Sequence, residues 1–284
     1  MALLRTVAML TLLVILAACS TESSGESAPT QDPANVGLVA RVNGIGITEA
    51  DFQREFERRQ VGSNAASMEA LQAQVLETLI RQELISQSAP SLDVVVTDAD
   101  IQAEYDNLRT LSPDDEAWAQ FLETNNYTEE EMQIAQRDVL LTQRVQAALM
   151  ADYLGDVEQV NARHIVVQTR EEAESILERL NNGEGFASLA AEQSFDITTR
   201  EIGGNLGWFA RNELFYTNLE EIAFSLEVGE IAGPIPTLLG FHVIQTLDKA
   251  VRPIEAERLP MLSESIFGNW LATQTENATI ERYR

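Results

Sequence analysis

The sequence predicts an α+β protein, a mostly helical domain followed by a compact mixed domain, and three observations support this. Apolar residues recur at helical spacing through most of residues 36–155. From Val160 to residue 248, β-rich segments alternate with short helices and a glycine-rich stretch. After Arg252-Pro253 the helical spacing returns and continues to residue 284. A chain of 284 residues is long enough for two domains, each with its own core.

The composition disfavours several classes of protein. With 45% hydrophobic and 23% charged residues, the chain has the composition of a folded protein. Its 45 acidic residues oppose 19 basic ones, and the net charge of −26 repels the phosphates of nucleic acids. A single Cys leaves no disulfide framework or thiolate metal cage, and two His leave little for a zinc site. We therefore expect no metal site and no nucleic-acid partner.

Residues 1–18 are predicted to be a secretion signal, because an apolar run ending in small residues follows Arg5 and is too short for a stable membrane span. Leu16-Ala17-Ala18-Cys19 resembles the lipobox of bacterial lipoproteins, which implies cleavage before Cys19 and lipid attachment to it. The lipid would anchor the protein to a bacterial membrane, at the outer face of the cell membrane or in the periplasm. The alternative is an ordinary signal peptide and a free Cys19. Residues 19–35 are predicted to be a flexible tether.

The helical domain, residues 36–155, is predicted to begin with a strand from Val36 to Asn43 and a turn over residues 44–46. Thr48 then opens a helix with Asp51 at its third position. An apolar stripe predicts a long helix over residues 67–88. Three more helix starts are predicted at Thr97, at Ser112-Pro113 and at Thr128, where Glu131 completes a capping box. The last of these helices has an apolar stripe of Ile134, Val139, Leu140, Val145 and Leu149 and ends near Tyr153.

The second domain, residues 160–248, is predicted to begin and end with a strand. The first strand covers residues 162–167, and amphipathic helices follow over 171–180 and 185–193. Glycines at 203, 204 and 207 break the next stretch, and a short helix precedes a closing strand at 241–247. Residues 253–284 are predicted to form a final helix. This helix must bury an apolar stripe, and the helical domain is its expected partner. The stripe consists of Leu259, Leu262, Ile266 and Trp270.

Seven short motifs follow one another within residues 160–248. They are Val160-Asn-Ala-Arg-His164-Ile-Val-Val167, Gly185-Phe186-Ala187 with Leu189-Ala190, Ser194-Phe-Asp196, Gly203-Gly204-Asn205-Leu206-Gly207-Trp208-Phe209, Ala223-Phe224-Ser225-Leu226, Gly229-Glu230-Ile231 with Gly233-Pro234-Ile235, and Gly240-Phe241-His242-Val243-Ile244. In this order and spacing they resemble the parvulin-type peptidyl-prolyl isomerases. Both histidines of the chain fall on the two histidine positions of that family.

The resemblance implies an FKBP-like fold, with a small antiparallel sheet and surrounding helices, and cis-trans isomerisation of Xaa-Pro bonds. Rotation about the amide has a barrier of about 18 to 20 kcal/mol but breaks no bond, so no metal or other cofactor is expected. The catalyst must instead bind the twisted amide better than the planar forms. The implied catalytic residues are His164, Asp196, His242 and Thr237, with the imidazoles holding the hydrogen-bond network and Asp196 facing the amide. Two alternatives for Asp196 stay open: a turn or helix-end carboxylate, or an alignment that slips to Ile197.

The predicted proline pocket departs from the family pattern. Phe215 or Leu214 takes the place of a Met, and Leu219 takes the place of a Phe that packs on the proline ring. Leu239 stands where a small polar residue is common. An apolar pocket survives these changes. The predicted substrate-binding residues are Val166, Leu206, Leu214, Phe215 and Leu219.

The order of the whole chain resembles the bacterial extracytoplasmic foldases of the PrsA and SurA kind, whose helical domain binds unfolded exported chains. The implied partners are unfolded or partly folded exported proteins with Xaa-Pro bonds. Two functions remain open: a membrane-anchored isomerase, and a holdase chaperone whose parvulin domain is structural or weakly active. A carboxylate-based hydrolase is disfavoured, because acidic pairs such as Asp114-Asp115 lie at helix starts, where the helix dipole accounts for them.

Overall fold

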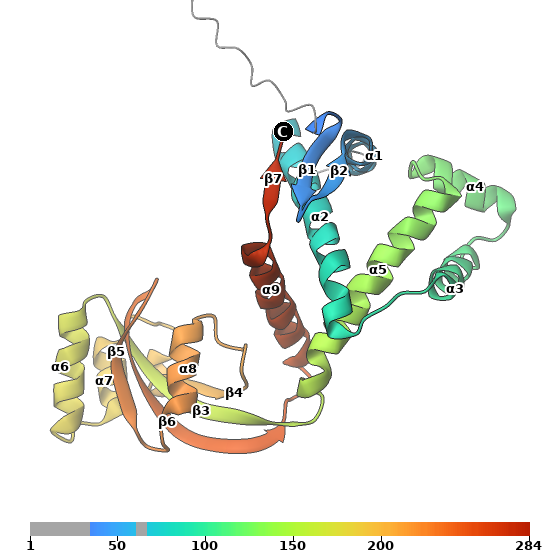
Figure 1. Ribbon diagram of the computed structural model, residues 1–284. Helices are drawn as coiled ribbons and strands as arrows, with labels where there is room; N and C mark the ends of the chain where they lie inside the picture. Colours follow the sequence, from blue (N-terminus) through green and yellow to red (C-terminus); the bar gives the residue numbers. More distant parts are fainter. Residues whose placement is uncertain (1–34, 61–66) are drawn as a thin grey trace, which may run out of the picture. The chain divides into compact units, whose positions relative to one another are not determined.

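The computed structural model describes residues 35–60 and 67–284, and Figure 1 shows their helices and strands. The predictions for residues 1–18, for Cys19 and for the tether up to residue 34 lie outside the described residues. Within the described part, helices combine with two separate antiparallel sheets, so the predicted α+β class is confirmed.

The first sheet has the strand order β2-β1-β7. β1 (Leu38–Val42) pairs with β2 (Ile45–Thr48) and, on its other edge, with β7 (Ile280–Arg282). The prediction of a turn over residues 44–46 is wrong, because the chain reverses at Asn43 and Gly44, both in the left-handed region, and Ile45 starts a new strand. The prediction of a helix to the end of the chain is also wrong. Backbone pairing with β1 takes residues 280–282 out of helical geometry.

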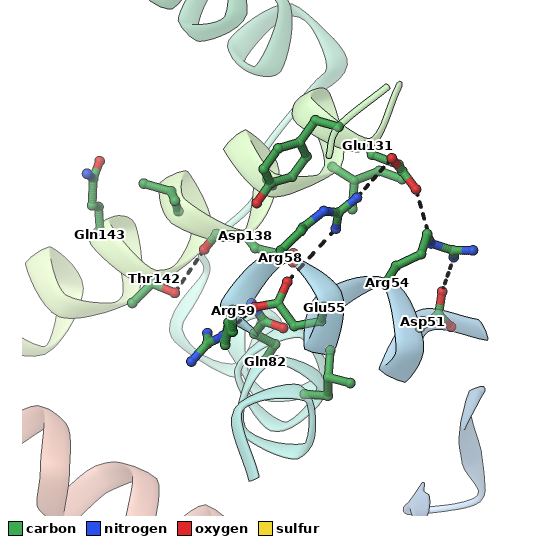
Figure 2. Close-up of a pocket in the computed structure, with 15 residues that line it drawn as sticks. Asp51, Arg54, Glu55, Arg58, Arg59, Gln82, Glu131, Asp138, Thr142 and Gln143 are labelled. Carbon is green, nitrogen blue, oxygen red and sulfur yellow. Dashed lines mark hydrogen bonds and ion pairs between the residues drawn. The ribbon is translucent and has the colours of Figure 1, made fainter. Parts of the chain in front are cut away.

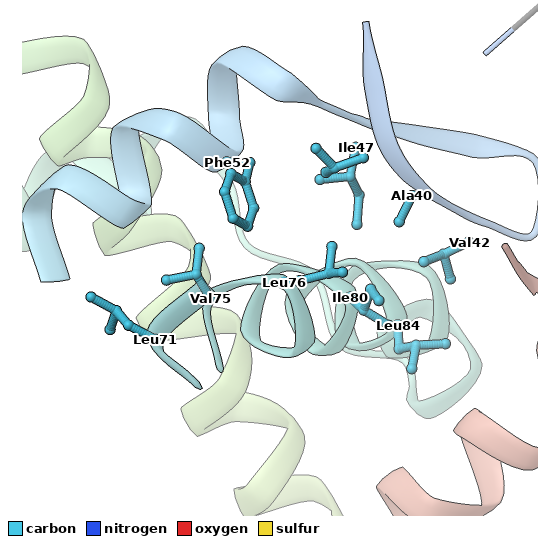
Figure 3. Packing of buried hydrophobic residues seen from close by; sticks show 10 residues of the cluster. Ala40, Val42, Ile47, Phe52, Leu71, Val75, Leu76, Ile80 and Leu84 are labelled. Atoms are coloured by element: carbon cyan, nitrogen blue, oxygen red, sulfur yellow. The ribbon is translucent and has the colours of Figure 1, made fainter. Parts of the chain in front are cut away.

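The long helix α2 (Met68–Ser88) supports this sheet. Ser67 caps its first turn, and its apolar stripe confirms the predicted helix over residues 67–88. Figure 3 shows the stripe packed beneath the β1–β2 hairpin and α1 (Glu49–Gln60). Phe52 of α1 is fully buried there. Thr48 and Asp51 cap α1 as predicted, since Thr48 Oγ1 accepts the Asp51 amide at 3.1 Å.

The helices α3 (Asp98–Arg109), α4 (Asp115–Thr124) and α5 (Glu129–Met150) follow. The predicted starts at Thr97 and Thr128 are confirmed as capping boxes. The start of α4 lies two residues beyond Ser112-Pro113, because the Asp114 side chain accepts the Ala117 amide and so serves as the N-cap.

The predicted apolar stripe of α5 is partly wrong. Ile134 and Val139 are about half exposed, whereas Leu141 and Val145 are buried. The buried face of α5 is the one that packs with Ile85 of α2. The final helix α9 (Leu259–Asn277) adds Phe267, Trp270 and Leu271 to the same cluster. Helices from both ends of the described chain therefore share one core.

The second sheet has the order β4-β3-β6-β5, with every pairing antiparallel. Its strands are β3 (Asp156–Val167), β4 (Asn205–Phe209), β5 (Ile231–Thr237) and β6 (Gly240–Pro253). The two predicted strands are present and longer than expected, while β4 and β5 were not predicted. Helices α6 (Arg170–Asn181) and α7 (Phe186–Gln193) cover one face, and α8 (Thr217–Ser225) covers the other.

Candidate active site

The two histidines lie side by side on the two central strands of the second sheet. His164 of β3 pairs with Ile244 of β6, and Val166 pairs with His242, so the histidines are diagonal neighbours on one face. Their ring centroids are 5.2 Å apart. Antiparallel pairing therefore brings together two residues that are 78 positions apart in the sequence.

A continuous series of hydrogen bonds joins four side chains, called here the histidine network. His164 Nε2 lies 2.8 Å from Asp196 Oδ2. The Nδ1 atoms of His164 and His242 lie 3.2 Å apart, and His242 Nε2 lies 2.8 Å from Thr237 Oγ1. The structure thus brings together all four predicted catalytic residues. Asp196 faces His164, whereas Ile197 is 74% exposed.

The carboxylate of Asp196 fixes the direction of these hydrogen bonds. An ionised carboxylate only accepts, so His164 donates from Nε2 and keeps a bare Nδ1. His242 then donates from Nδ1 to that bare nitrogen, and its own Nε2 accepts from the Thr237 hydroxyl. Thr237 Oγ1 in turn accepts the Leu239 amide at 3.1 Å. Both imidazoles are neutral in this arrangement, and every ring nitrogen has a partner.

Two threonines that sequence reasoning missed hold the Asp196 carboxylate. The Thr198 hydroxyl donates to Oδ1 and the Thr199 hydroxyl to Oδ2, each at 2.6 Å, and the Thr198 amide also donates to Oδ1 at 3.0 Å. Burial, the largest influence, raises the pKa of Asp196, but the hydrogen bonds from Thr198, Thr199 and His164 outweigh it and hold this pKa below its usual value. The signal for this turn is an Asp followed two and three residues later by Thr.

Burial keeps both imidazoles neutral. His164 is 6% exposed and His242 is 1% exposed. Burial lowers the pKa of His164, although the hydrogen bond to Asp196 and the charge of that residue act in the opposite direction. Burial, with a smaller contribution from neighbouring His164, lowers the pKa of His242 to about 4. At neutral pH the network therefore carries a single charge, on Asp196.

The glycine-rich stretch lets the chain approach His164 closely. Gly204 O accepts the His164 amide at 2.8 Å. Gly204 has φ +79°, and a Cβ atom there would lie 2.0 Å from His164 O. Two residues after His164 on β3, the Val166 amide donates to the Ser194 hydroxyl at 3.1 Å. This bond holds the segment that carries Asp196 against the strand. Ser194 was present in the predicted motif but had no predicted role.

The predicted proline-pocket residues divide into three groups. Leu206 and Leu214 are partly buried against the cluster beneath α8. Phe215 is 86% exposed. Val166 and Leu219 are buried at 0% and 3% exposure, so the structure places them in the core beneath the site and does not place them on a surface that a substrate reaches. Tyr216, which was not predicted, has its ring centroid 5.8 Å from that of His242 and contacts Phe215 edge to face.

A second feature lies on the helical part, where α1, α2 and α5 line a cavity of about 550 Å³ (Figure 2). Arg54 and Arg58 both pair with Glu131, at 3.0 and 2.8 Å. The guanidinium of Arg58 also lies 3.9 Å from the ring centroid of Tyr127. Apolar side chains complete the lining, among them Leu79, Ile134 and Val139.

Within the described residues, no helix is both long and apolar enough to span a membrane.

Comparison with known proteins gives two family matches and several relatives. Residues 149–250 match the PPIC-type PPIase domain, and residues 2–146 match the SurA-like N-terminal domain. The foldase protein PrsA of Caldanaerobacter subterraneus is 29% identical over 276 residues, covering 85% of this chain and 81% of the relative. The foldase protein PrsA of Halalkalibacterium halodurans is 26% identical, covering 86% and 72%.

Among solved structures, a peptidylprolyl isomerase (PrsA) from Bacillus cereus aligns at a TM-score of 0.46 and 21% identity, covering 88% of this chain and 95% of that one. The two family matches cover the helical and the mixed parts of the chain in the order that the sequence motifs predicted. The chain belongs to the family of foldases that join a SurA-like N-terminal domain to a PPIC-type, or parvulin-type, peptidyl-prolyl cis-trans isomerase domain.

Proposed function

We propose that the histidine network is the catalytic site of this isomerase and that its substrates are Xaa-Pro bonds in unfolded or partly folded exported proteins. The observation that supports this most strongly is the direct contact between the two imidazoles, at 3.2 Å, with Asp196 at one end and Thr237 at the other. This arrangement fixes one charge, and two exposed apolar residues are linked to the network. Phe215 packs on Tyr216 beside His242, and the Leu239 amide donates to Thr237.

The proposed role of Asp196 follows from the charge distribution of an amide. In a planar amide, resonance places negative charge on the carbonyl oxygen, and twisting the C–N bond removes it. A carboxylate near that oxygen therefore repels the planar forms more than the twisted one, which lowers the barrier. Asp196 is suited to this role because its side chain is 18% exposed and its charge is held by Thr198 and Thr199.

The imidazoles are proposed to act as positioning residues. They do not exchange protons with the substrate in this mechanism, because the reaction breaks no bond to hydrogen. From the neighbouring strands β3 and β6, their hydrogen bonds hold the Asp196 carboxylate and the Thr237 hydroxyl in fixed places. Leu206, Leu214 and Tyr216 are proposed to contact the proline ring, with Phe215 at the exposed edge and with Val166 and Leu219 supporting the site from below.

A proline-limited refolding assay tests the proposal. The protein without residues 1–19 is expected to accelerate the slow phase of a denatured substrate whose refolding waits for an Xaa-Pro bond, a step that takes tens of seconds or longer without a catalyst. A slow phase no faster than that in buffer would contradict it.

The location is a separate proposal. We infer that the chain is exported and that lipid on Cys19 anchors it to a bacterial membrane, as the lipobox resemblance of residues 16–19 supports. Two acyl chains or more give stable membrane binding. Expression in bacteria fed a labelled fatty acid is expected to label the protein, and Cys19→Ser to remove the label. Equal labelling of both would refute lipidation at this residue.

A second candidate function is client holding by the helical part. The supporting observation is the cavity of Figure 2, whose walls include Ile134 and Val139, two aliphatic side chains that are about half exposed. The double variant Ile134→Gln and Val139→Gln is expected to suppress the aggregation of a proline-free client less well while keeping its isomerase rate. A double variant at Met261 and Leu111, which are exposed outside this cavity, is the control.

A further inference from the structure

The loop between β4 and α8 forms one wall of the proposed site. It covers residues 210–216 and contains Leu214, Phe215 and Tyr216. The Tyr216 ring lies beside His242, with 5.8 Å between centroids, and Phe215 contacts Tyr216 at 5.0 Å. The shape of this wall therefore depends on what holds the loop.

One support of the loop lies within the isomerase domain. Glu220 of α8 is 5% exposed, and its carboxylate accepts the amides of Asn212 and Leu214 at 2.9 and 3.0 Å. Asn212 has φ +70°, a left-handed conformation that Asn tolerates better than most residues. The buried carboxylate thus fixes the backbone on both sides of residue 213.

The other support comes from Tyr153, near the start of the matched isomerase segment, and from α9, which lies outside that segment. The Asn212 side-chain amide donates to Tyr153 Oη at 2.8 Å, and its side-chain oxygen accepts from Asn269 of α9 at 3.2 Å. The Ser265 hydroxyl of α9 donates to the Asn212 carbonyl at 2.7 Å. The backbone amide, backbone carbonyl and both side-chain polar atoms of Asn212 are therefore all hydrogen-bonded.

Two further contacts join the same regions. Arg258, directly before α9, donates to Glu213 Oε2 and to Trp208 O, each at 2.8 Å. Ala210, at the start of the loop, is buried with Leu262 and Ile266 of α9. The loop is thus packed and hydrogen-bonded against the helix that also completes the core of the helical part.

We propose that α9, acting through Ser265, Asn269 and the central residue Asn212, positions the substrate wall of the isomerase site and thereby sets its affinity for proline-containing segments. This inference rests on the proposed function of the histidine network. Among the described residues, no hydrogen bond joins the four network side chains to the loop, whose one ring contact with them is that of Tyr216 with His242. Loosening the loop is therefore expected to change substrate binding more than the rotation step. Asn212 is accordingly a positioning residue.

The test uses the full chain without residues 1–19 and the double variant Ser265→Ala and Asn269→Ala. Initial rates over a range of concentrations of an Xaa-Pro tetrapeptide give KM and kcat. The loss of two hydrogen bonds to one loop is expected to raise KM roughly threefold to tenfold with kcat within about twofold. Exchange of the Asn212 and Leu214 amides with solvent is expected to become roughly tenfold faster.

Two controls separate positioning from general destabilisation. Thr273→Ala removes a hydroxyl of the same helix. Within the part of the chain that the structure describes, this hydroxyl bonds only to the Asn269 carbonyl of α9, at 3.0 Å, so the variant should change neither KM nor amide exchange. When Ser265→Thr replaces Ser265→Ala in the double variant, the hydroxyl is kept, and part of the lost affinity for the tetrapeptide should return.

The outcomes are distinct. An unchanged KM in the double variant, unchanged exchange of the two amides, or a fall in kcat at constant KM would each overturn the proposal. If the unaltered protein fails to isomerise any tetrapeptide, the proposed function fails, and the amide exchange alone still decides whether α9 positions the loop.

Discussion

The proton positions in the histidine network can be measured directly, because the chain contains only two histidines. Protein without a histidine tag gives two sets of imidazole NMR signals. We expect His164 to carry its proton on Nε2 and His242 on Nδ1, since the ionised Asp196 accepts at one end of the network and the Thr237 hydroxyl donates at the other. The ¹⁵N shifts of the ring nitrogens distinguish these tautomers.

Lowering the pH tests the same arrangement, because it protonates the neutral histidines. The pKa of His242 is about 4 in the folded protein, against 6.5 in a model peptide. The unfolded chain therefore binds more protons between pH 4 and 6.5, so the contribution of His242 to stability is complete above pH 6.5 and declines as the pH falls through this window. A shift of this size corresponds to roughly 3 kcal/mol over the whole window, and His242 is 1% exposed, so solvent screening is small.

The assay compares the unaltered protein with His242→Asn, in which the side-chain amide can still donate toward His164 but does not titrate. Urea unfolding at pH 7.5 and pH 4.5 should show a larger loss of stability in the unaltered protein. Carboxylates such as Asp138, whose pKa burial raises, contribute equally to both proteins and cancel. A His242 titration midpoint near 6.5, or His164 protonated on Nδ1, would refute the reasoning.

The remaining predictions concern the carboxylate and the glycine of the site. Asp196→Ala should lower the isomerisation rate more than Thr237→Val, because only Asp196 is charged; the reverse order in the refolding assay would show that Asp196 does not face the amide. Gly204→Ala should destabilise the isomerase domain by about 3 kcal/mol or more, because its Cβ would lie 2.0 Å from His164 O. Gly44→Ala, at a similar φ of +86° but with no atom within 4 Å, should cost about 1 kcal/mol, and equal losses on urea unfolding would contradict the steric argument.

Local signals in the sequence located most helices. Thr97 and Thr128 were predicted as helix starts because Thr caps a first turn well, and at Thr128 the following Glu131 predicted a capping box. Such caps depend only on neighbouring residues, and the structure has a capping box at both positions. The strands β2, β4, β5 and β7 were missed. Each of these strands is short or interrupted by Gly or Pro. Its extended conformation is stabilised by pairing with an antiparallel neighbour, which local sequence patterns do not reveal.

The same division applies to the proposed site. The order and spacing of the parvulin-like motifs predicted His164, Asp196, His242 and Thr237. No comparable signal in the sequence marked Thr198, Thr199 and Tyr216, which look like ordinary turn and helix-start residues. Val166 and Leu219 were predicted to bind substrate, yet they are buried. An apolar residue near a site fits equally well in the pocket and in the core beneath it, and only the packing distinguishes the two.

The sequence by itself determined the family, the α+β class and the residue types of the proposed site, because these follow from short patterns along the chain. Only the tertiary structure decided that the two imidazoles touch, that Asn212 is held by α9, and that residues 280–282 leave the last helix to pair with β1. The physical reason is that each of these contacts joins residues far apart in sequence, where strand pairing and side-chain packing outweigh local propensity.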